Sequence, residues 1–92
     1  MNDEFDVDSA FELTEDEMKR DEELTYLLSK EVGRRFLWRI IDRVCGIHAS
    51  TFSSDKVIHA YAQGRRDVGV ELRNAVLSFS KEKYIQMEVE NL

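Results

Sequence analysis

The fold is decided by one stretch, Lys30–Gly46, which reads KEVGRRFLWRIIDRVCG. Its apolar residues recur at steps of three or four, the spacing of one face of an amphipathic α-helix. Gly46 follows them, where glycine is favoured just past a helix C-terminus. The stretch therefore predicts a helix over Lys30–Cys45. Its apolar face is formed by Val32, Leu37, Ile40, Ile41 and Val44.

The segment before this helix also has helical signals. Thr14 and Glu17 fit a capping box, in which the Thr hydroxyl and the Glu carboxylate each satisfy an amide at the start of a helix. We therefore expect a helix over about 15–28. Ser29 can then cap the helix that follows.

The length of the next helix depends on Gly64. If this glycine ended a helix, two short helices would follow the loop at 48–53. The apolar residues instead continue at helical steps through it, so we predict one helix over about 55–79, capped by Ser53 or Ser54. Gly64 would then lie on the inward face and permit a close crossing with the Lys30–Cys45 helix. The predicted inward stripe is Val57, Tyr61, Gly64, Val68, Leu72, Ala75 and Phe79.

These segments predict an all-α fold, a small bundle of about four helices, with the last helix beginning at Ser80. Ninety-two residues without proline fit one domain, which we place at 14–92. Residues 1–13 form an acidic arm that we expect to be flexible on its own. Its isolated apolar residues are too scattered to bury a face, but Phe5 and Phe11 are typical of anchors in a segment that orders on binding.

Charge is divided unequally along the chain. Residues 1–24 contain eleven acids and two bases, a net charge of −9, whereas residues 25–92 contain eleven bases and eight acids, a net charge of +3. The acidic segment could fold back on the basic body, shield it until a partner arrives, bind a basic partner or only be solvated.

Residue types that often carry chemistry are few. The single Cys45 cannot form an internal disulfide, and no Cys/His cluster has zinc spacing, so we expect neither a metal nor a cofactor. His48 follows a helix end, and His59 lies close enough to Asp55 for an ion pair. No nucleophile, phosphate-loop or paired-carboxylate motif occurs. We therefore expect a non-enzymatic protein that is soluble, unprocessed and cytoplasmic.

Arginines give the clearest surface signal. Arg35, Arg39 and Arg43 recur every four residues and line one stripe of their helix, with Arg34 beside them. Such a stripe could contact phosphates, but acids interrupt it. Pairing with acids of the 15–28 helix or of the arm, or with an acidic partner protein, fits better. Trp38 either closes the core or, if exposed, adds an aromatic group typical of an interface hot spot.

Three blocks carry a family resemblance. Gly33–Gly46, Tyr61–Gly69 and Tyr84–Glu88 are similar to a family of small tailed-phage proteins, the Bordetella-phage-like small phage domain, over about 29–90. The first two blocks each contain a Gly-Arg-Arg triplet, and a glycine inside a helical pattern suggests that something approaches the backbone closely. Ser29–Val32 departs from the Thr/Ser-Pro-Glu-like helix start of that family.

The resemblance implies a part encoded among phage head, portal and packaging functions. We expect a virion-associated or virion-assembly protein that docks on portal, capsid or connector components, or on copies of itself. It would act in the host cytoplasm during assembly and in the virion. The alternative is a phage regulatory protein that binds DNA or a host nucleic-acid-binding protein. The candidate partner-binding residues are Phe5, Phe11, Arg34, Arg35, Trp38, Arg39, Arg43, Arg65 and Arg66.

Overall fold

The computed structural model describes residues 14–92, and within them the chain is helical without strands. The helices are α2 (Glu15–Leu28), α3 (Glu31–Trp38), its continuation as the π-helix η1 (Arg39–Val44), α4 (Lys56–Phe79) and α5 (Lys81–Glu90). Counting α3 and η1 as one helix, the predicted all-α bundle of about four helices is confirmed over this range. The predicted arm at 1–13, with Phe5 and Phe11, lies outside the described residues.

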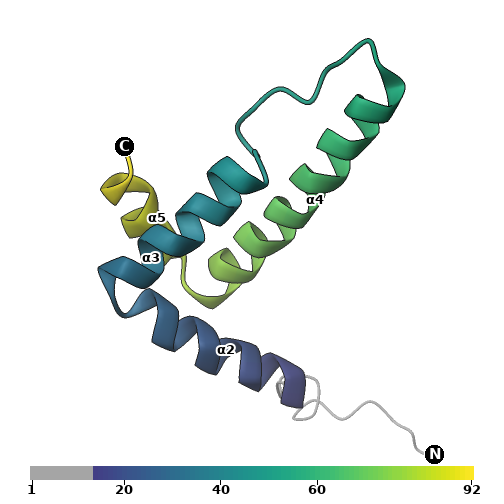
Figure 1. Ribbon diagram of the computed structural model, residues 1–92. Helices are drawn as coiled ribbons and strands as arrows, with labels where there is room; N and C mark the ends of the chain where they lie inside the picture. The colour runs from purple at the N-terminus through teal and green to yellow at the C-terminus, as the bar shows by residue number, and fades with distance from the viewer. Residues whose placement is uncertain (1–13) are drawn as a thin grey trace, which may run out of the picture.

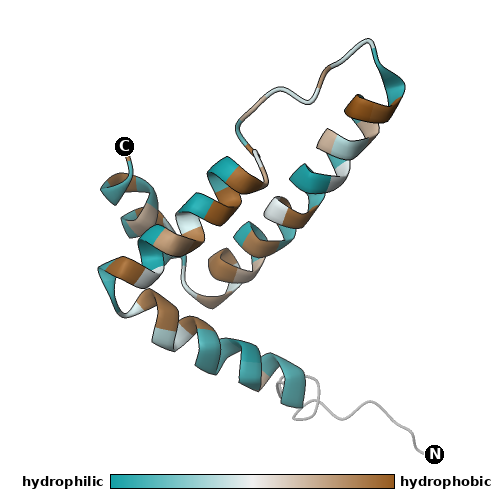
Figure 2. Ribbon diagram, in the orientation of Figure 1, coloured by the Kyte–Doolittle hydropathy of each residue, from teal (hydrophilic) through white to brown (hydrophobic). Residues whose placement is uncertain are grey.

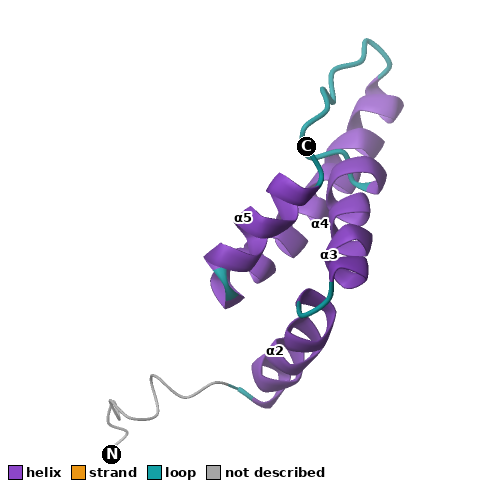
Figure 3. Cartoon of the chain, turned by 90° about the vertical axis from the view of Figure 1, so that its left-hand side faces the viewer, coloured by secondary structure: helices purple, strands orange, loops and turns teal. Residues whose placement is uncertain are grey.

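The helices form a thin, elongated body. Figure 1 shows α4 running alongside α3 and η1, with α5 packed behind them, while α2 leaves α3 at an elbow and passes below the end of α4. The turned view in Figure 3 shows α2 standing away from the other three helices. The body measures 55 × 34 × 17 Å.

The core lies where the four helices meet. Figure 2 shows that α2 is hydrophilic along its first half and hydrophobic near α3, because only its C-terminal half reaches this core. Four side chains are less than 2% exposed: Leu28, Ile41, Val76 and Met87. Around them the buried apolar residues are Leu24, Leu37, Cys45, Ile47 and Tyr84.

Three predicted helix ends are confirmed, two by hydrogen bonds and one by its backbone conformation. The Thr14 hydroxyl accepts a bond from the Glu17 amide at 3.1 Å, which is the Thr half of the predicted capping box. The Ser80 hydroxyl accepts from the Lys83 amide at 3.2 Å and caps α5. Gly46 has a φ of 66°, the left-handed conformation in which glycine ends a helix without strain.

Two predicted caps are wrong. The Ser29 hydroxyl donates to a carbonyl three residues earlier at 2.8 Å, and α3 instead begins after Lys30, which makes no side-chain cap. At α4 the cap is Asp55, not Ser53 or Ser54. Its carboxylate accepts from the amides two and three residues later, at 2.9 and 3.1 Å, because a carboxylate competes well for these positively polarised donors.

The π-turns of η1 were not predicted. The Cys45 amide donates to the Ile40 carbonyl, five residues back, at 2.8 Å. Because these turns are wider than α-helical ones, the side chains after Ile41 that face the core differ from those expected for an α-helix. Cys45 is 5% exposed, whereas Val44, predicted to be inward, is 50% exposed.

The surface that α4 turns to the core is only partly the predicted one. Leu72 and Phe79 of the predicted stripe pack against the core, partly buried, but the most deeply buried positions of α4 lie on another side. Its buried residues are Gly69 and Val76, about a quarter of a turn away from the expected stripe. A Cβ atom at Gly69 would lie only 2.5 Å from the Cβ of Cys45, so this glycine, and not Gly64, permits the close crossing with η1. The first half of the predicted inward stripe is exposed, and we call it the α4 stripe: Val57, Tyr61, Gly64 and Val68.

Candidate interaction surfaces

Arg34 is a buried structural link. Its Nε and Nη2 donate to the two carboxylate oxygens of Glu90, each at 2.8 Å, and its Nη1 donates to the Leu28 carbonyl at 2.9 Å. The residue is 7% exposed. It therefore joins α3 to α5 and to the last turn of α2. The expected pairing of an arginine within the chain is found here, but the acid belongs to α5 and not to α2.

This pair shifts both ionisation equilibria. The hydrogen bonds and charge of Arg34 lower the pKa of Glu90, against the opposing effect of burial. The carboxylate in turn raises the pKa of Arg34. Arg34 was predicted to contact a partner, but its side chain is engaged within the fold, so it is not an open docking cation.

Gly33 explains the first Gly-Arg-Arg triplet. A Cβ atom there would overlap the backbone carbonyl of Leu27. The expected close backbone approach is therefore present at Gly33, where it forms the elbow between α2 and α3.

The remaining arginines of this helix form one surface, the arginine face, defined as Arg35, Arg39 and Arg43. All three are exposed. They lie together on a shallow cleft of about 210 Å³, so the predicted stripe persists across the junction of α3 and η1. The cleft is lined by Arg35, Trp38, Arg39, Asp42, Arg43 and Asn91.

An aromatic group accompanies these cations. Phe36 is 47% exposed, and the guanidinium of Arg39 lies 5.6 Å from the centre of its ring. Among residues 14–92, the only ion pair of Arg35 is an exposed contact with Glu31 at 3.6 Å, which is weak. A second cleft of about 370 Å³ adjoins the first, lined by Leu27, Val32, Gly33, Arg35, Phe36 and Arg39.

Trp38 is half-buried at the edge of the core. Its ring centre lies 6.2 Å from that of Tyr84 and 5.7 Å from that of His48. The indole therefore packs against the core while it also lines the cleft of the arginine face, combining the two alternatives weighed from the sequence.

The histidines are held by local contacts. His48 Nδ1 lies 2.9 Å from the Asp42 carboxylate. The predicted ion pair of His59 with Asp55 is wrong, because His59 Nδ1 donates to the Thr51 carbonyl at 2.8 Å while Asp55 caps α4.

The second Gly-Arg-Arg triplet lies elsewhere. Arg65 and Arg66 belong to α4 and do not line either cleft at the arginine face. Arg65 is exposed and stacks over Tyr61, with 5.5 Å between its guanidinium and the ring centre. The predicted partner-binding set is therefore divided between a buried link, the arginine face and α4.

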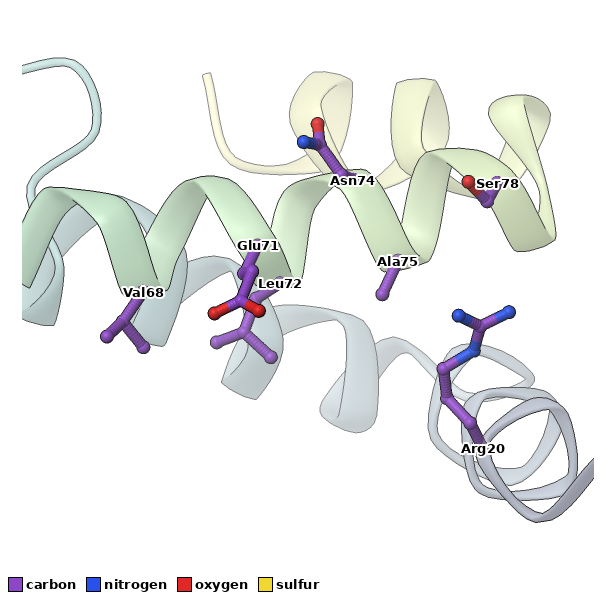
Figure 4. A pocket seen from close by; sticks show the side chains of 7 residues that line it. All are labelled: Arg20, Val68, Glu71, Leu72, Asn74, Ala75 and Ser78. Atoms are coloured by element: carbon purple, nitrogen blue, oxygen red, sulfur yellow. The ribbon is translucent and has the colours of Figure 1, made fainter. Parts of the chain in front are cut away.

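A further cleft, of about 510 Å³, lies between α2 and α4 (Figure 4). Arg20 reaches toward it from α2, and Val68 connects it to the α4 stripe. The sequence did not indicate this cleft, because its apolar residues belong to the stripe that was expected to be buried. It is lined by Arg20, Val68, Glu71, Leu72, Asn74, Ala75 and Ser78.

The sequence profile of the Bbp19-like phage proteins matches residues 11–88. The chain belongs to this family. The match of this Bbp19-like protein begins earlier than the resemblance seen from about residue 29, so it includes all of α2 and reaches Phe11. No characterised protein and no solved structure matches the chain.

Two further kinds of functional feature were sought among the described residues of this Bbp19-like chain, a metal site and a membrane-spanning helix. Within 14–92, no group of three His, Cys, Asp or Glu side chains is arranged to hold a metal ion. None of the helices described is long and apolar enough to cross a membrane.

Proposed function

We propose that this Bbp19-like chain is a non-enzymatic part of the phage particle or of its assembly, and that it works by docking on other phage proteins. Portal, capsid or connector components are the partners we infer, in the host cytoplasm during assembly and then in the virion. The observation that carries the proposal is the arginine face, where exposed cations border two clefts with an exposed Phe36 and a half-exposed Trp38.

The composition of this face supports protein recognition. Arginine and tryptophan are enriched at interface hot spots, where a rigid aromatic group and a planar cation are desolvated together. Arg35, Arg39 and Arg43 keep their guanidinium groups at the surface, unlike Arg34. An acidic, partly apolar partner surface would satisfy both the charges and Phe36.

The shape of the protein also supports docking. The described residues have a radius of gyration of 16.9 Å, compared with about 12 Å for a compact domain of similar length. Many large apolar side chains therefore remain in solvent, and contacts with other chains would cover them. Those most exposed are Tyr26, Phe52, Val57, Tyr61 and Leu92.

The test is quantitative mass spectrometry of purified virions, followed by capture from infected cells with tagged chain. We expect the chain at a fixed ratio to the portal or capsid protein, and we expect Arg39→Gln with Arg43→Gln to reduce capture of that protein. The matched control is Lys56→Gln with Lys81→Gln, which removes two exposed cations elsewhere. Equal capture by both double variants would reject the arginine face as the docking surface.

The exposed arginines of the arginine face also support a second candidate function, DNA binding. A phage regulator that binds DNA would use them on phosphates, and each neutralised phosphate makes binding more sensitive to salt, with a slope of about −0.9 in log affinity against log salt. The double arginine variant should then lower this slope in a DNA titration. Salt-independent or undetectable DNA binding would leave protein docking as the function.

A further inference from the structure

We propose that the α4 stripe is the contact between two copies of this chain, which pair antiparallel about a twofold axis between Tyr61 and Gly64. This inference goes beyond docking on other phage proteins and concerns a different surface from the arginine face.

The α4 stripe is an apolar face without a partner among residues 14–92. Val57 is 79% exposed, Tyr61 68% and Val68 53%. The residues of α4 that pack on the core lie in its C-terminal half, from Gly69 to Phe79. The α4 stripe lies in the preceding half of the helix and is a separate, exposed apolar surface. It lies about a quarter of a turn from the side of α4 that carries Gly69 and Val76, and only its last residue, Val68, borders the cleft between α2 and α4.

Gly64 has no role within the described fold. No atom of residues 14–92 would lie within 4 Å of a Cβ atom built on it, apart from its own helix and chain neighbours. Gly33 and Gly69 differ, because backbone or side-chain atoms fill the space beside each of them. A glycine in a helix interior lowers helix stability, so its presence here is explained if another chain approaches the backbone at this point.

The α4 stripe is complementary to itself when reversed. Its residues follow one another at steps of four, three and four, an order that reads the same in both directions. Antiparallel pairing therefore sets Tyr61 of each copy opposite Gly64 of the other, and Val57 opposite Val68. The ring of Tyr61 on one copy then faces the space beside Gly64 on the other. Such alternation of large and small residues allows two helices to interdigitate.

This self-complementarity is what favours a second copy over another occupant. A twofold interface requires one surface patch to match itself. The register also avoids like charges, because it sets Arg65 level with Ala60, and Asp67 level with Ile58, of the second copy. Arg65 already lies over the ring of Tyr61, where its charge can remain at the rim of the contact.

The test is the mass of the purified full chain by sedimentation equilibrium over a wide concentration range. We expect a reversible monomer–dimer equilibrium. Gly64→Leu fills the space that the opposite Tyr61 would use, and should raise the dimer dissociation constant by roughly tenfold or more. The matched control is Gln63→Leu, which adds a leucine to an adjacent, exposed position off the stripe and should leave the equilibrium unchanged.

A separate control tests whether the Gly64→Leu variant still folds. Because nothing described contacts the Cβ position of residue 64, Gly64→Leu should keep the helical circular dichroism of the unmodified chain when both are monomeric. Its melting temperature should be equal or slightly higher, since leucine has a higher helix propensity than glycine. A chain that stays monomeric at every concentration overturns the inference, as does a Gly64→Leu dimer of unchanged affinity. Loss of a phage partner on Gly64→Leu, without any dimer, would assign the stripe to that partner instead.

Orientation is tested by mixing two variants. Val57→Cys and Val68→Cys chains, distinguished by mass, should form a mixed disulfide under mild oxidation. Disulfides only between identical chains would indicate parallel pairing and overturn the twofold arrangement. These measurements need no phage, so their failure would leave docking through the arginine face untouched.

Discussion

Arg34 was predicted from the sequence to bind a partner, but in the structure it forms a buried ion pair within the fold. It belongs to a run of arginines that all looked suited to a partner, yet within that run it alone is buried, and there it pairs with Glu90. The sequence indicated that some arginines would pair within the chain. It could not single out Glu90, which lies 56 residues away, because periodicity places a residue on a face and does not say which distant helix covers that face.

The Arg34–Glu90 pair makes stability depend on pH. Glu90 has a lowered pKa when folded, so its contribution is complete above the unfolded-state pKa of about 4.3 and is lost as the pH falls through the folded value. Glu90→Gln should therefore melt at a lower temperature than the unmodified chain at pH 7. The gap should narrow as the pH falls below about 4.3 and on through the lowered pKa of Glu90, because the folded chain then loses the carboxylate charge.

Thermal melts across this pH range check the expectation. Glu22→Gln removes an exposed carboxylate from α2 and serves as the control, with little change in melting temperature. A gap between Glu90→Gln and the unmodified chain that is the same at pH 7 and pH 3 would show that the ion pair contributes no charge-dependent stability.

Among the elements, α4 marks the limit of sequence prediction. Its length through Gly64 was predicted correctly, since the apolar steps do not break there. Its orientation was predicted only in part. Leu72 and Phe79 pack against the core as expected, but the buried Gly69 and Val76 lie on a side of the helix that the apolar periodicity does not single out. The π-turns of η1 were missed for a related reason. They lie where the chain packs closely against α4 at Gly69, and no local residue pattern predicts them.

Two of the three helical glycines, Gly33 and Gly64, should respond in opposite directions to the same substitution. Gly33→Ala forces a methyl group into the Leu27 carbonyl at the elbow and should destabilise the chain by about 1–3 kcal/mol. Gly64→Ala adds a methyl group in open space and should stabilise the monomer by about 0.5–1 kcal/mol, because alanine restricts the unfolded chain.

Urea denaturation at a concentration low enough to keep the chain monomeric measures both effects. Each variant is the control of the other, since the chemical change is identical. Equal shifts of the two midpoints would mean that helix propensity alone, and not the close approach at the elbow, determines the role of Gly33.

The whole molecule depends on a small core. A chain of this length has a free energy of unfolding of about 5–14 kcal/mol. Met87 is completely buried, so Met87→Ala should remove about 2–5 kcal/mol of this stability by leaving a cavity. The urea midpoint of the monomer measures the loss. Ile85→Ala is the control on the same helix, and its smaller effect follows from the 47% exposure of Ile85.

A comparable loss in the two variants would contradict the assignment of α5 to the core through Met87. A loss confined to Met87→Ala would instead show that the last helix is part of the same cooperative unit as the other three. That distinction matters for a body only 17 Å thick, in which few side chains are shielded from both sides.

The close crossing of α4 and η1 at Gly69 buries a thiol, that of Cys45, whose reactivity can be used to follow the opening of this crossing. Cys45 is the only thiol of the sequence, and it is shut in where α4 passes over η1. A thiol reagent can reach it only when these two segments separate. The labelling rate in the native state therefore times the opening of this one crossing, and it does so in the unaltered protein, free or bound to whatever it assembles with.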